Sequence, residues 1–348
     1  MREKNLIVKP DLLRRRLMLQ APAALAALSV APSIALSSKA SGTVERGDLI
    51  AKLHEETGLS LDYIKQAIAA AEYDESVITR IETPYESKTY AEYRPLFVHK
   101  ALAEKGMAYL QEHRSIFDKA YEKYGVQPEI IAAILGMETR YGHYKGKDRV
   151  LDSLYTLATG YPRRANFFRR ELGEFLKLCR EERLEPTSVQ GSYAGAFGTT
   201  QFIPSSYRGY AVDADGDGKR DVWNSPTDII NSVAHYFHRY GWDDQRPVAH
   251  WQSHLPKKVF FARMLHAETR KWRHLEELRR HAKLELPESW QDDDRVALIE
   301  RRTSQGKRTA IVHYNFYVIT RWNRSYNYAM AITELAHMLG CSLCEVES

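Results

Sequence analysis

The chain has 348 residues, of which 44% are hydrophobic and 27% charged, a composition typical of a folded protein and unlike a disordered one. Residues 1–40 carry seven lysines and arginines against two acids, so they account for the whole formal net charge of +5. Because the remaining chain is formally neutral, its charge argues against a nucleic-acid partner, which would need a basic protein surface.

The N-terminal segment, residues 1–40, predicts an export signal. Three arginines at 14–16 precede an apolar run over 17–36, and residues 37–40 are small enough for cleavage. The arginines suit either a twin-arginine or a general secretory signal. An uncleaved membrane anchor is the alternative, because the run is nearly long enough to span a bilayer. We expect a periplasmic protein whose only membrane contact is this leader, if it is uncleaved.

Helical periodicity dominates the next part of the chain, residues 48–125, and is clearest over 61–68 and 98–124. A second helical block follows over 127–242, and Pro128 suits the first turn of its first helix. We expect a helical domain over 41–126 and a second, site-bearing domain over 127–247.

The pattern changes over residues 248–317. A charged helix is predicted over 268–281, followed by a β-hairpin of strands 295–300 and 309–314 joined through 304–307. The tail returns to helix over 317–339. The sequence therefore predicts a mainly α (α+β) protein with a small inserted β domain, and a C-terminal helix over 322–348 that packs back on the helical domain.

One acid lies on the apolar face of the helix that begins near Pro128. Ile131, Ile134 and Glu138 recur at helical spacing, so the carboxylate shares a face with buried aliphatic side chains. Partial desolvation favours the protonated form of a carboxylate, which a general acid needs. Position alone, however, favours a structural role, as a helix cap or as a partner of Arg140.

A glycine-rich segment over 190–207 lets the backbone approach a ligand closely, and Ser192, Tyr193 and Gln201 could donate or accept hydrogen bonds there. A tightly packed turn between helices explains the composition equally well. The 21 tyrosines could face sugar rings, although packing explains any single one. The arginines over 163–170 form a basic patch, which is more often a solvated helix face.

The segment 213–221 matches a calcium loop, with acids at positions 1, 3, 5 and 9, a backbone carbonyl at position 7 and glycine at position 6. Position 12 is Asn224, and Asp228 could close a slightly longer loop instead. The alternative is a turn rich in aspartate and glycine. A single such loop suits a structural calcium ion. Its predicted ligands are Asp213, Asp215, Asp217, Lys219, Asp221 and Asp228.

Cys341 and Cys344 have the spacing of a redox pair or half a zinc site, but no second ligand pair stands beside them in the sequence. A terminal disulfide or spare thiols is the favoured interpretation.

Taken together, seven motifs resemble the lytic murein transglycosylase B family, the soluble, lysozyme-like lytic transglycosylases. The resemblance runs from about residue 93 to residue 338. The motifs are YRPLF at 93–97, YGV at 124–126, GMETRYG at 136–142, YPRR at 161–164, GSYAGA at 191–196, QFIPSSY at 201–207 and NFYVITRWNRS at 315–325.

This resemblance implies a lysozyme-like core between a helical and a small β domain. It implies an enzyme that cleaves the β-1,4 bond between N-acetylmuramic acid and N-acetylglucosamine in peptidoglycan. Glu138 would be the single acid/base, assisted by the sugar's acetamido group, and the product would be a 1,6-anhydromuramyl end. No catalytic cofactor is implied, and the partner would be a peptidoglycan glycan strand bound by a monomer.

The resemblance also implies the residues of the glycan cleft. These are Tyr93, Arg163, Arg164, Tyr193, Ser192, Gln201 and Tyr236, with Tyr317, Trp322 and Asn323 in a motif near the cleft. The family often has tyrosine where Trp322 stands and methionine where Phe197 stands. The loop from Asp213 aligns with the family's calcium loop, with a one-residue insertion before Asp228.

Overall fold

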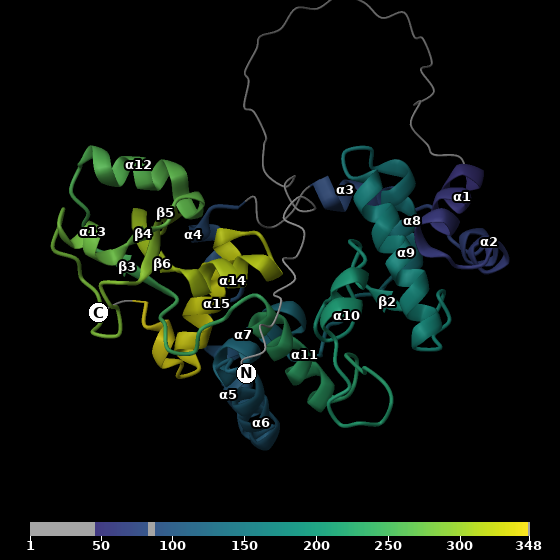
Figure 1. Ribbon diagram of the computed structural model, residues 1–348, viewed down its shortest axis with the longest axis horizontal. Helices are drawn as coiled ribbons and strands as arrows, with labels where there is room; N and C mark the ends of the chain where they lie inside the picture. Colours follow the sequence, from purple (N-terminus) through teal and green to yellow (C-terminus); the bar gives the residue numbers. More distant parts are fainter. Residues whose placement is uncertain (1–45, 83–87, 347–348) are drawn as a thin grey trace, which may run out of the picture. The chain divides into compact units, whose positions relative to one another are not determined.

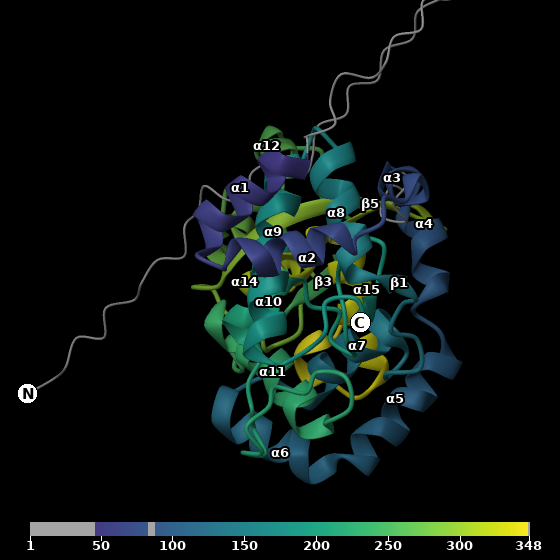
Figure 2. The ribbon, with the colours of Figure 1, turned by 90° about the vertical axis from the view of Figure 1, so that its right-hand side faces the viewer.

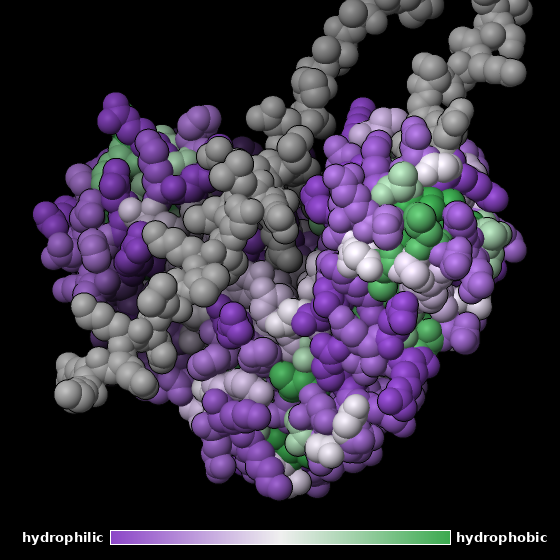
Figure 3. Space-filling model, turned by 45° about the vertical axis from the view of Figure 1, so that its right-hand side comes forward, coloured by the Kyte–Doolittle hydropathy of each residue, from purple (hydrophilic) through white to green (hydrophobic). Residues whose placement is uncertain are grey.

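The computed structural model describes residues 46–82 and 88–346 (Figure 1). The predicted leader lies outside these residues and stays a prediction. Among the described helices, none is both long and apolar enough to cross a membrane. Hydrophilic side chains cover most of the face drawn in Figure 3, and the hydrophobic ones gather in a few separate groups.

The described chain begins with helices, as its periodicity predicts. The predicted helix over 98–124 is divided at His113, which caps one helix and precedes the next. The elements are α1 (Arg46–Thr57), α2 (Leu61–Ala69), α3 (Glu75–Glu82), α4 (Tyr90–Tyr93), the 3-10 turn η2 (Arg94–Leu96), α5 (Lys100–Glu112) and α6 (Arg114–Tyr124).

The second helical block carries the segments that build the site. Its elements are α7 (Pro128–Thr139), β1 (Asp148–Arg149), α8 (Val150–Gly160), α9 (Ala165–Glu181), β2 (Gln190–Gly191), α10 (Pro204–Tyr210) and α11 (Pro226–Arg239). Helices α8 and α9 pack against each other, and α1 and α10 pack on α9 (Figure 2). The short strands β1 and β2 pair antiparallel and join the start of α8 to the glycine-rich segment.

Helix α7 is the central helix of the larger core. Pro128 occupies its first turn, as predicted, and every side chain from Ile130 to Met137 is buried. A helix that is apolar all round must be covered on all sides. Here α5, α6, α11 and α15 (Tyr326–Met338) provide that cover.

The predicted β-hairpin is confirmed, with longer strands than expected. Strands β5 (Arg295–Thr303) and β6 (Gly306–His313) pair antiparallel around a two-residue turn. With β3 (Ala249–Gln252) and β4 (Arg273–His274) they form a four-stranded sheet of order β3-β6-β5-β4.

Both faces of this sheet are buried, in different cores. Ala297 and Ile299 of β5 face the main core, whereas Val296 and Leu298 face a smaller cluster. That cluster includes side chains of α12 (Val259–Ala267) and α13 (Leu275–Arg279). The alternation follows from the two-residue period of a strand. The sheet therefore links the small β unit to the rest of the described chain.

The predicted helix over 268–281 is wrong. Glu268 has a left-handed φ of 47°, and a short 3-10 turn, η3 (Glu268–Arg270), follows α12. Arg273 and His274 then pair with β5, which leaves only the five residues of α13 helical. The sequence over 268–281 has helical periodicity, but the pairing of Arg273 and His274 with β5 holds their backbone in a strand conformation.

The predicted helix over 317–339 is two helices. Helix α14 (Tyr314–Trp322) begins directly after β6, and α15 follows after a break at 323–325. Ser325 is the N-cap of α15, and its hydroxyl accepts the N–H of Tyr328. Serine at that position is a helix start signal. The last described element is a 3-10 turn, η4 (Ser342–Cys344), so the predicted C-terminal helix does not extend to 348 in the described residues.

Candidate active site

Glu138 lies in the last turn of α7, and its side chain is half-buried. Two donors converge on one of its oxygens. The indole N–H of Trp322 donates to Oε1 at 3.0 Å, and the hydroxyl of Tyr328 donates to the same oxygen at 2.6 Å. Glu138 is therefore a carboxylate held in one orientation by two side chains from the far end of the chain.

The break between α14 and α15 is what brings the two donors together. Trp322 is the last residue of α14, and Tyr328 lies in the first turn of α15. A continuous helix would place positions six apart on different faces. We did not predict Tyr328 as a site residue, although Ser325 three positions earlier could have revealed where α15 begins.

Aromatic rings surround the indole that contacts Glu138. The ring of Trp322 lies 4.8 Å from that of Tyr236, 5.0 Å from Phe202 and 5.8 Å from Phe237. The hydroxyl of Tyr236 donates to the carbonyl of Arg321 at 2.6 Å, which fixes the end of α14. This aromatic packing holds the indole of Trp322 in place.

Two residues shortly after Glu138 adopt an unusual backbone conformation. Arg140 and Tyr141 have φ values of 52° and 62°, a region that non-glycine residues rarely occupy. The turn folds the ring of Tyr141 back across α7, where a Cβ on Gly136 would lie 2.6 Å from its hydroxyl. A Cβ on Gly106 of α5 would also clash with that hydroxyl. The two glycines therefore form the slot that receives Tyr141.

Thr139 joins the end of α7 to the glycine-rich segment. Its hydroxyl donates to the carbonyl of Thr199 at 3.1 Å and accepts the N–H of Gly142 at 2.9 Å. Thr139 is only 1% exposed, so these bonds are buried. The segment that follows α7 and the glycine-rich loop are thus held as one unit beside Glu138.

Ser192 and Gln201, both predicted ligand contacts, also hold the loop itself. The Ser192 oxygen accepts the N–H groups of Ala194 and Ala196 at 3.3 and 3.2 Å. Gln201 has a left-handed φ of 49°, and its amide donates to the carbonyls of Lys145 and Gly198. The Ser192 hydroxyl hydrogen and the Gln201 carbonyl oxygen are the groups that could meet a ligand.

The other predicted cleft residues differ in exposure. Tyr93 and Tyr236 are each 2% exposed, so their rings are buried and offer almost no surface to a ligand. Arg163 is exposed. Arg164 lies over the ring of Phe167 at 4.2 Å, and burial lowers the pKa of its guanidinium. The half-buried members of the predicted set are Arg164, Ser192, Tyr193, Gln201, Tyr317, Trp322 and Asn323.

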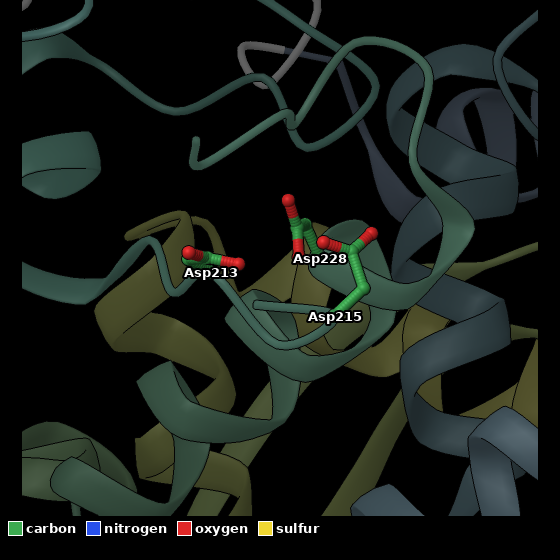
Figure 4. Close-up of side chains that lie close together, drawn as sticks. All are labelled: Asp213, Asp215 and Asp228. Atoms are coloured by element: carbon green, nitrogen blue, oxygen red, sulfur yellow. The ribbon is translucent and has the colours of Figure 1, made fainter. Parts of the chain in front are cut away.

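Three predicted metal ligands come together in the loop before α11. The carboxylates of Asp213, Asp215 and Asp228 each offer an oxygen within 4.8 Å of the others (Figure 4). Asp228 is fully buried, and both of its oxygens accept backbone N–H groups that hold the two ends of the loop, from Ala214 and Asp221. Burial raises the pKa of Asp228, with the nearby carboxylates adding to the effect.

The remaining predicted ligands lie outside that group of three. The carboxylates of Asp217 and Asp221 accept backbone N–H groups of their own turns, at Lys219 and at Trp223. A cluster of three carboxylates, one of them buried, has the hard oxygen donors that calcium prefers. The residues present therefore fit a calcium ion held chiefly by Asp213, Asp215 and Asp228.

Residues 45–337 match the family of the transglycosylase SLT domain. The chain belongs to this family. Over 250 residues it is 38% identical to membrane-bound lytic murein transglycosylase B of Escherichia coli, a match that covers 70% of this chain. The match spans 65% of that relative, less than two thirds of its length.

Solved structures give the same family. Soluble lytic transglycosylase SltB1 from Pseudomonas aeruginosa is similar, with a TM-score of 0.75 and 38% identity over 84% of this chain and 97% of that one. Lytic transglycosylase Slt35 of E. coli in complex with calcium has a TM-score of 0.74 and 31% identity over 86% of this chain and 94% of that one. The predicted lysozyme-like, mainly α fold with a small β part is confirmed.

Proposed function

We propose that this protein is a lytic transglycosylase that cleaves the β-1,4 bond between N-acetylmuramic acid and N-acetylglucosamine in peptidoglycan. The observation that carries the proposal is the half-buried carboxylate of Glu138, oriented by Trp322 and Tyr328. Family membership and the murein-cleaving relatives support the substrate class.

The hydrogen bonds to Glu138 suggest how it would act. Two donors hold Oε1, so they would orient the carboxyl group that passes its proton to the glycosidic oxygen. After that bond breaks, the same carboxylate would remove the proton of the muramyl 6-hydroxyl, and the acetamido group would stabilise the intermediate. No water would be consumed, unlike in glycosidases that use two carboxylates.

We infer the substrate-binding groups from the loops beside Glu138. The hydroxyl of Ser192 and the carbonyl of Gln201 would hydrogen-bond the sugars, and Tyr193, Tyr317 and Asn323 would supply half-buried contacts. Tyr93 and Tyr236, whose rings are buried, would lie behind these groups. The exposed Arg163 and the half-buried Arg164 would suit carboxylates of the peptide stems.

A calcium ion would have a structural role in the loop that precedes α11. Asp213, Asp215 and Asp228 would be its main ligands, with Asp217, Asp221 and the Lys219 carbonyl as further predicted donors. The related Slt35 structure contains calcium. The ion would fasten the loop and would take no part in the reaction.

The location, assembly and domain limits are also proposals. The leader over 1–40 supports export to the periplasm. We also retain a monomer as the proposed assembly. We retain a helical domain over 41–126, a core over 127–247 and a β-containing domain over 248–317, for which the separate small hydrophobic cluster is support.

Digestion of purified murein sacculi tests the function, with the released muramyl ends identified by mass spectrometry. We expect 1,6-anhydro ends from the wild-type protein and none from a Glu138→Gln variant. Reducing muramyl ends would instead show a muramidase that uses water. Failure to release any fragment would indicate a protein that only binds glycan, and full activity of Glu138→Gln would refute the site.

A further inference from the structure

The last described residues lie against the open edge of the four-stranded sheet. Strand β3 is an edge strand, paired with β6 on one side. On its other side, Val248 donates to the carbonyl of Leu343 at 3.1 Å and Trp251 donates to the carbonyl of Val346 at 2.9 Å. The C-terminal segment thus covers N–H groups that would otherwise be exposed at an edge.

Two cysteines meet in this segment. Cys341 and Cys344 are 3% and 0% exposed, and their Sγ atoms lie 2.7 Å apart. That separation is well inside the contact distance of two non-bonded sulfurs. The N–H of Cys344 also donates to the carbonyl of Cys341, so the two residues close a tight turn. Such a turn keeps the Cα atoms within about 7 Å, in the range that a disulfide needs.

We propose that Cys341 and Cys344 form an intramolecular disulfide that closes the turn between the end of α15 and the residues that bond the sheet edge. The inference rests on the proposed export, because disulfides persist in oxidising compartments. A zinc site is less suitable: among the described residues, no third histidine, cysteine or acidic ligand groups with the pair.

The bond would form by exchange with a donor disulfide, either a protein disulfide or a small-molecule one. The thiolate of one cysteine attacks a donor sulfur, which forms a mixed disulfide and releases one donor thiol. The thiolate of the other cysteine then attacks the protein sulfur of that mixed disulfide and releases the second donor thiol. The cysteines are oxidised, the donor is reduced by two electrons, and both protons go to the donor thiols.

Burial would protect the bond once the chain has folded. Burial raises the pKa of Cys344 well above its usual value, with the Cys341 sulfur adding to the effect. A thiol that stays protonated is a poor nucleophile, so the bond would form before the segment is buried, and an external thiol could not easily reach the sulfurs afterwards. The third cysteine, Cys179 of α9, is buried alone, and burial raises the pKa of its thiol to about 12. Cys179 is therefore an internal control.

The test uses the full chain, refolded from urea in a buffer of oxidised and reduced glutathione. The protein is then quenched with acid and alkylated under denaturing conditions. We expect one alkylated cysteine, Cys179, before reduction and all three after it. The intact mass of unalkylated protein should rise by two hydrogen atoms on reduction. A Cys179→Ser variant should keep the mass difference, and a Cys341→Ser/Cys344→Ser variant should lose it.

Three alkylated cysteines without reduction, or disulfide-linked dimers on a non-reducing gel, would overturn the proposal. Hydrogen exchange gives a second measurement: the Trp251 amide should exchange faster in the double serine variant than in the oxidised wild type. Equal exchange would mean that the bond does not fasten the segment. Murein cleavage by the double variant should be retained, so that failure of the disulfide and failure of the proposed enzyme are distinguished.

Discussion

Tyr328 donates its phenolic hydrogen to Oε1 of Glu138 at 2.6 Å, although the two residues are 190 positions apart in the chain. Replacing Tyr328 by phenylalanine removes this bond and keeps the ring. A hydrogen bond to a charged group contributes about 1.5–3 kcal/mol, so we expect kcat to fall roughly tenfold or more. KM should change little, because the bond orients Glu138 rather than the sugar. Release of muramyl ends from sacculi measures both.

Tyr326→Phe is the matched control for that variant. Tyr326 is the first residue of α15, in the same helical turn as Tyr328. Its hydroxyl forms a hydrogen bond with the hydroxyl of Thr269 instead of with Glu138. An equal loss of kcat in both variants would mean that the effect comes from α15 as a whole. If kcat is unchanged in Tyr328→Phe, then Tyr328 has no role in positioning Glu138.

At position 322 we expect high activity only with a residue that can still donate a hydrogen bond to Glu138. Trp322→Phe keeps an aromatic ring against Phe202 and Tyr236 but loses the N–H that reaches Glu138. We expect a loss of kcat of similar size to that of Tyr328→Phe. Trp322→Tyr should retain more activity, because a phenol can replace the indole donor. If the phenylalanine variant proves as active as the tyrosine variant, the N–H does not matter.

Calcium is expected to stabilise the folded protein. A ligand that binds only the folded state raises the free energy of unfolding, by about 2.7 kcal/mol at a hundredfold excess over Kd. Added calcium should therefore raise the unfolding temperature by several degrees, and a chelator should reverse the shift. Asp213→Asn should lose this response. Asp62→Asn, at an exposed position in α2, should keep it, and a calcium-insensitive wild type would exclude the site.

Gly136→Ala is expected to destabilise the protein, because the new methyl group would meet the ring of Tyr141. Overpacking of this kind costs about 1–3 kcal/mol. Gly209→Ala in α10 is the control, since nothing lies within 4 Å of its added Cβ. Urea unfolding measures both. Equal stability of the two variants would show that the Tyr141 slot can widen freely.

Acid should weaken the ion pairs between α9 and α10. Arg208 binds both carboxylate oxygens of Glu181, and these hydrogen bonds are the main reason that the pKa of Glu181 lies below its usual 4.5. The stabilisation is complete above about pH 4.5 and is lost as the pH falls through the lowered pKa. Glu181→Gln should therefore lose less stability than wild type between neutral pH and about pH 3.

Glu104→Gln is the control for the acid experiment. Glu104 forms an exposed pair with Lys100 within α5, where solvent screening leaves little stabilisation. This variant should follow the wild-type pH dependence in urea unfolding. If Glu181→Gln does the same, the pair with Arg208 contributes nothing measurable.

Local signals predicted the start of α7 and the approach of Asp213, Asp215 and Asp228 to one another. Pro128 marked the start of α7, and the spacing of the aspartates marked the loop. Prediction from the sequence failed where tertiary pairing overrode local preference. Arg273 and His274 sit in a strongly charged, helix-like run, yet they pair with β5. No local signal in that run indicates a partner strand some twenty residues further along.

The site itself was only partly predictable. Glu138 stood out by its place on an apolar helix and by its motif, but Tyr328 did not. Its role depends on the break after Trp322, which turns two separate helix ends towards one oxygen. A helical pattern that continues across a break hides such a relationship, because periodicity alone places Tyr328 among core residues.

Glu138 takes its orientation from two neighbouring helices, because Trp322 ends α14 and Tyr328 lies in the first turn of α15. Helix α15 packs on both α7 and α14. A substitution that shifts α15 against either helix would therefore turn the carboxylate of Glu138 without touching it, so the sensitivity of this group to mutation extends well beyond its own hydrogen bonds.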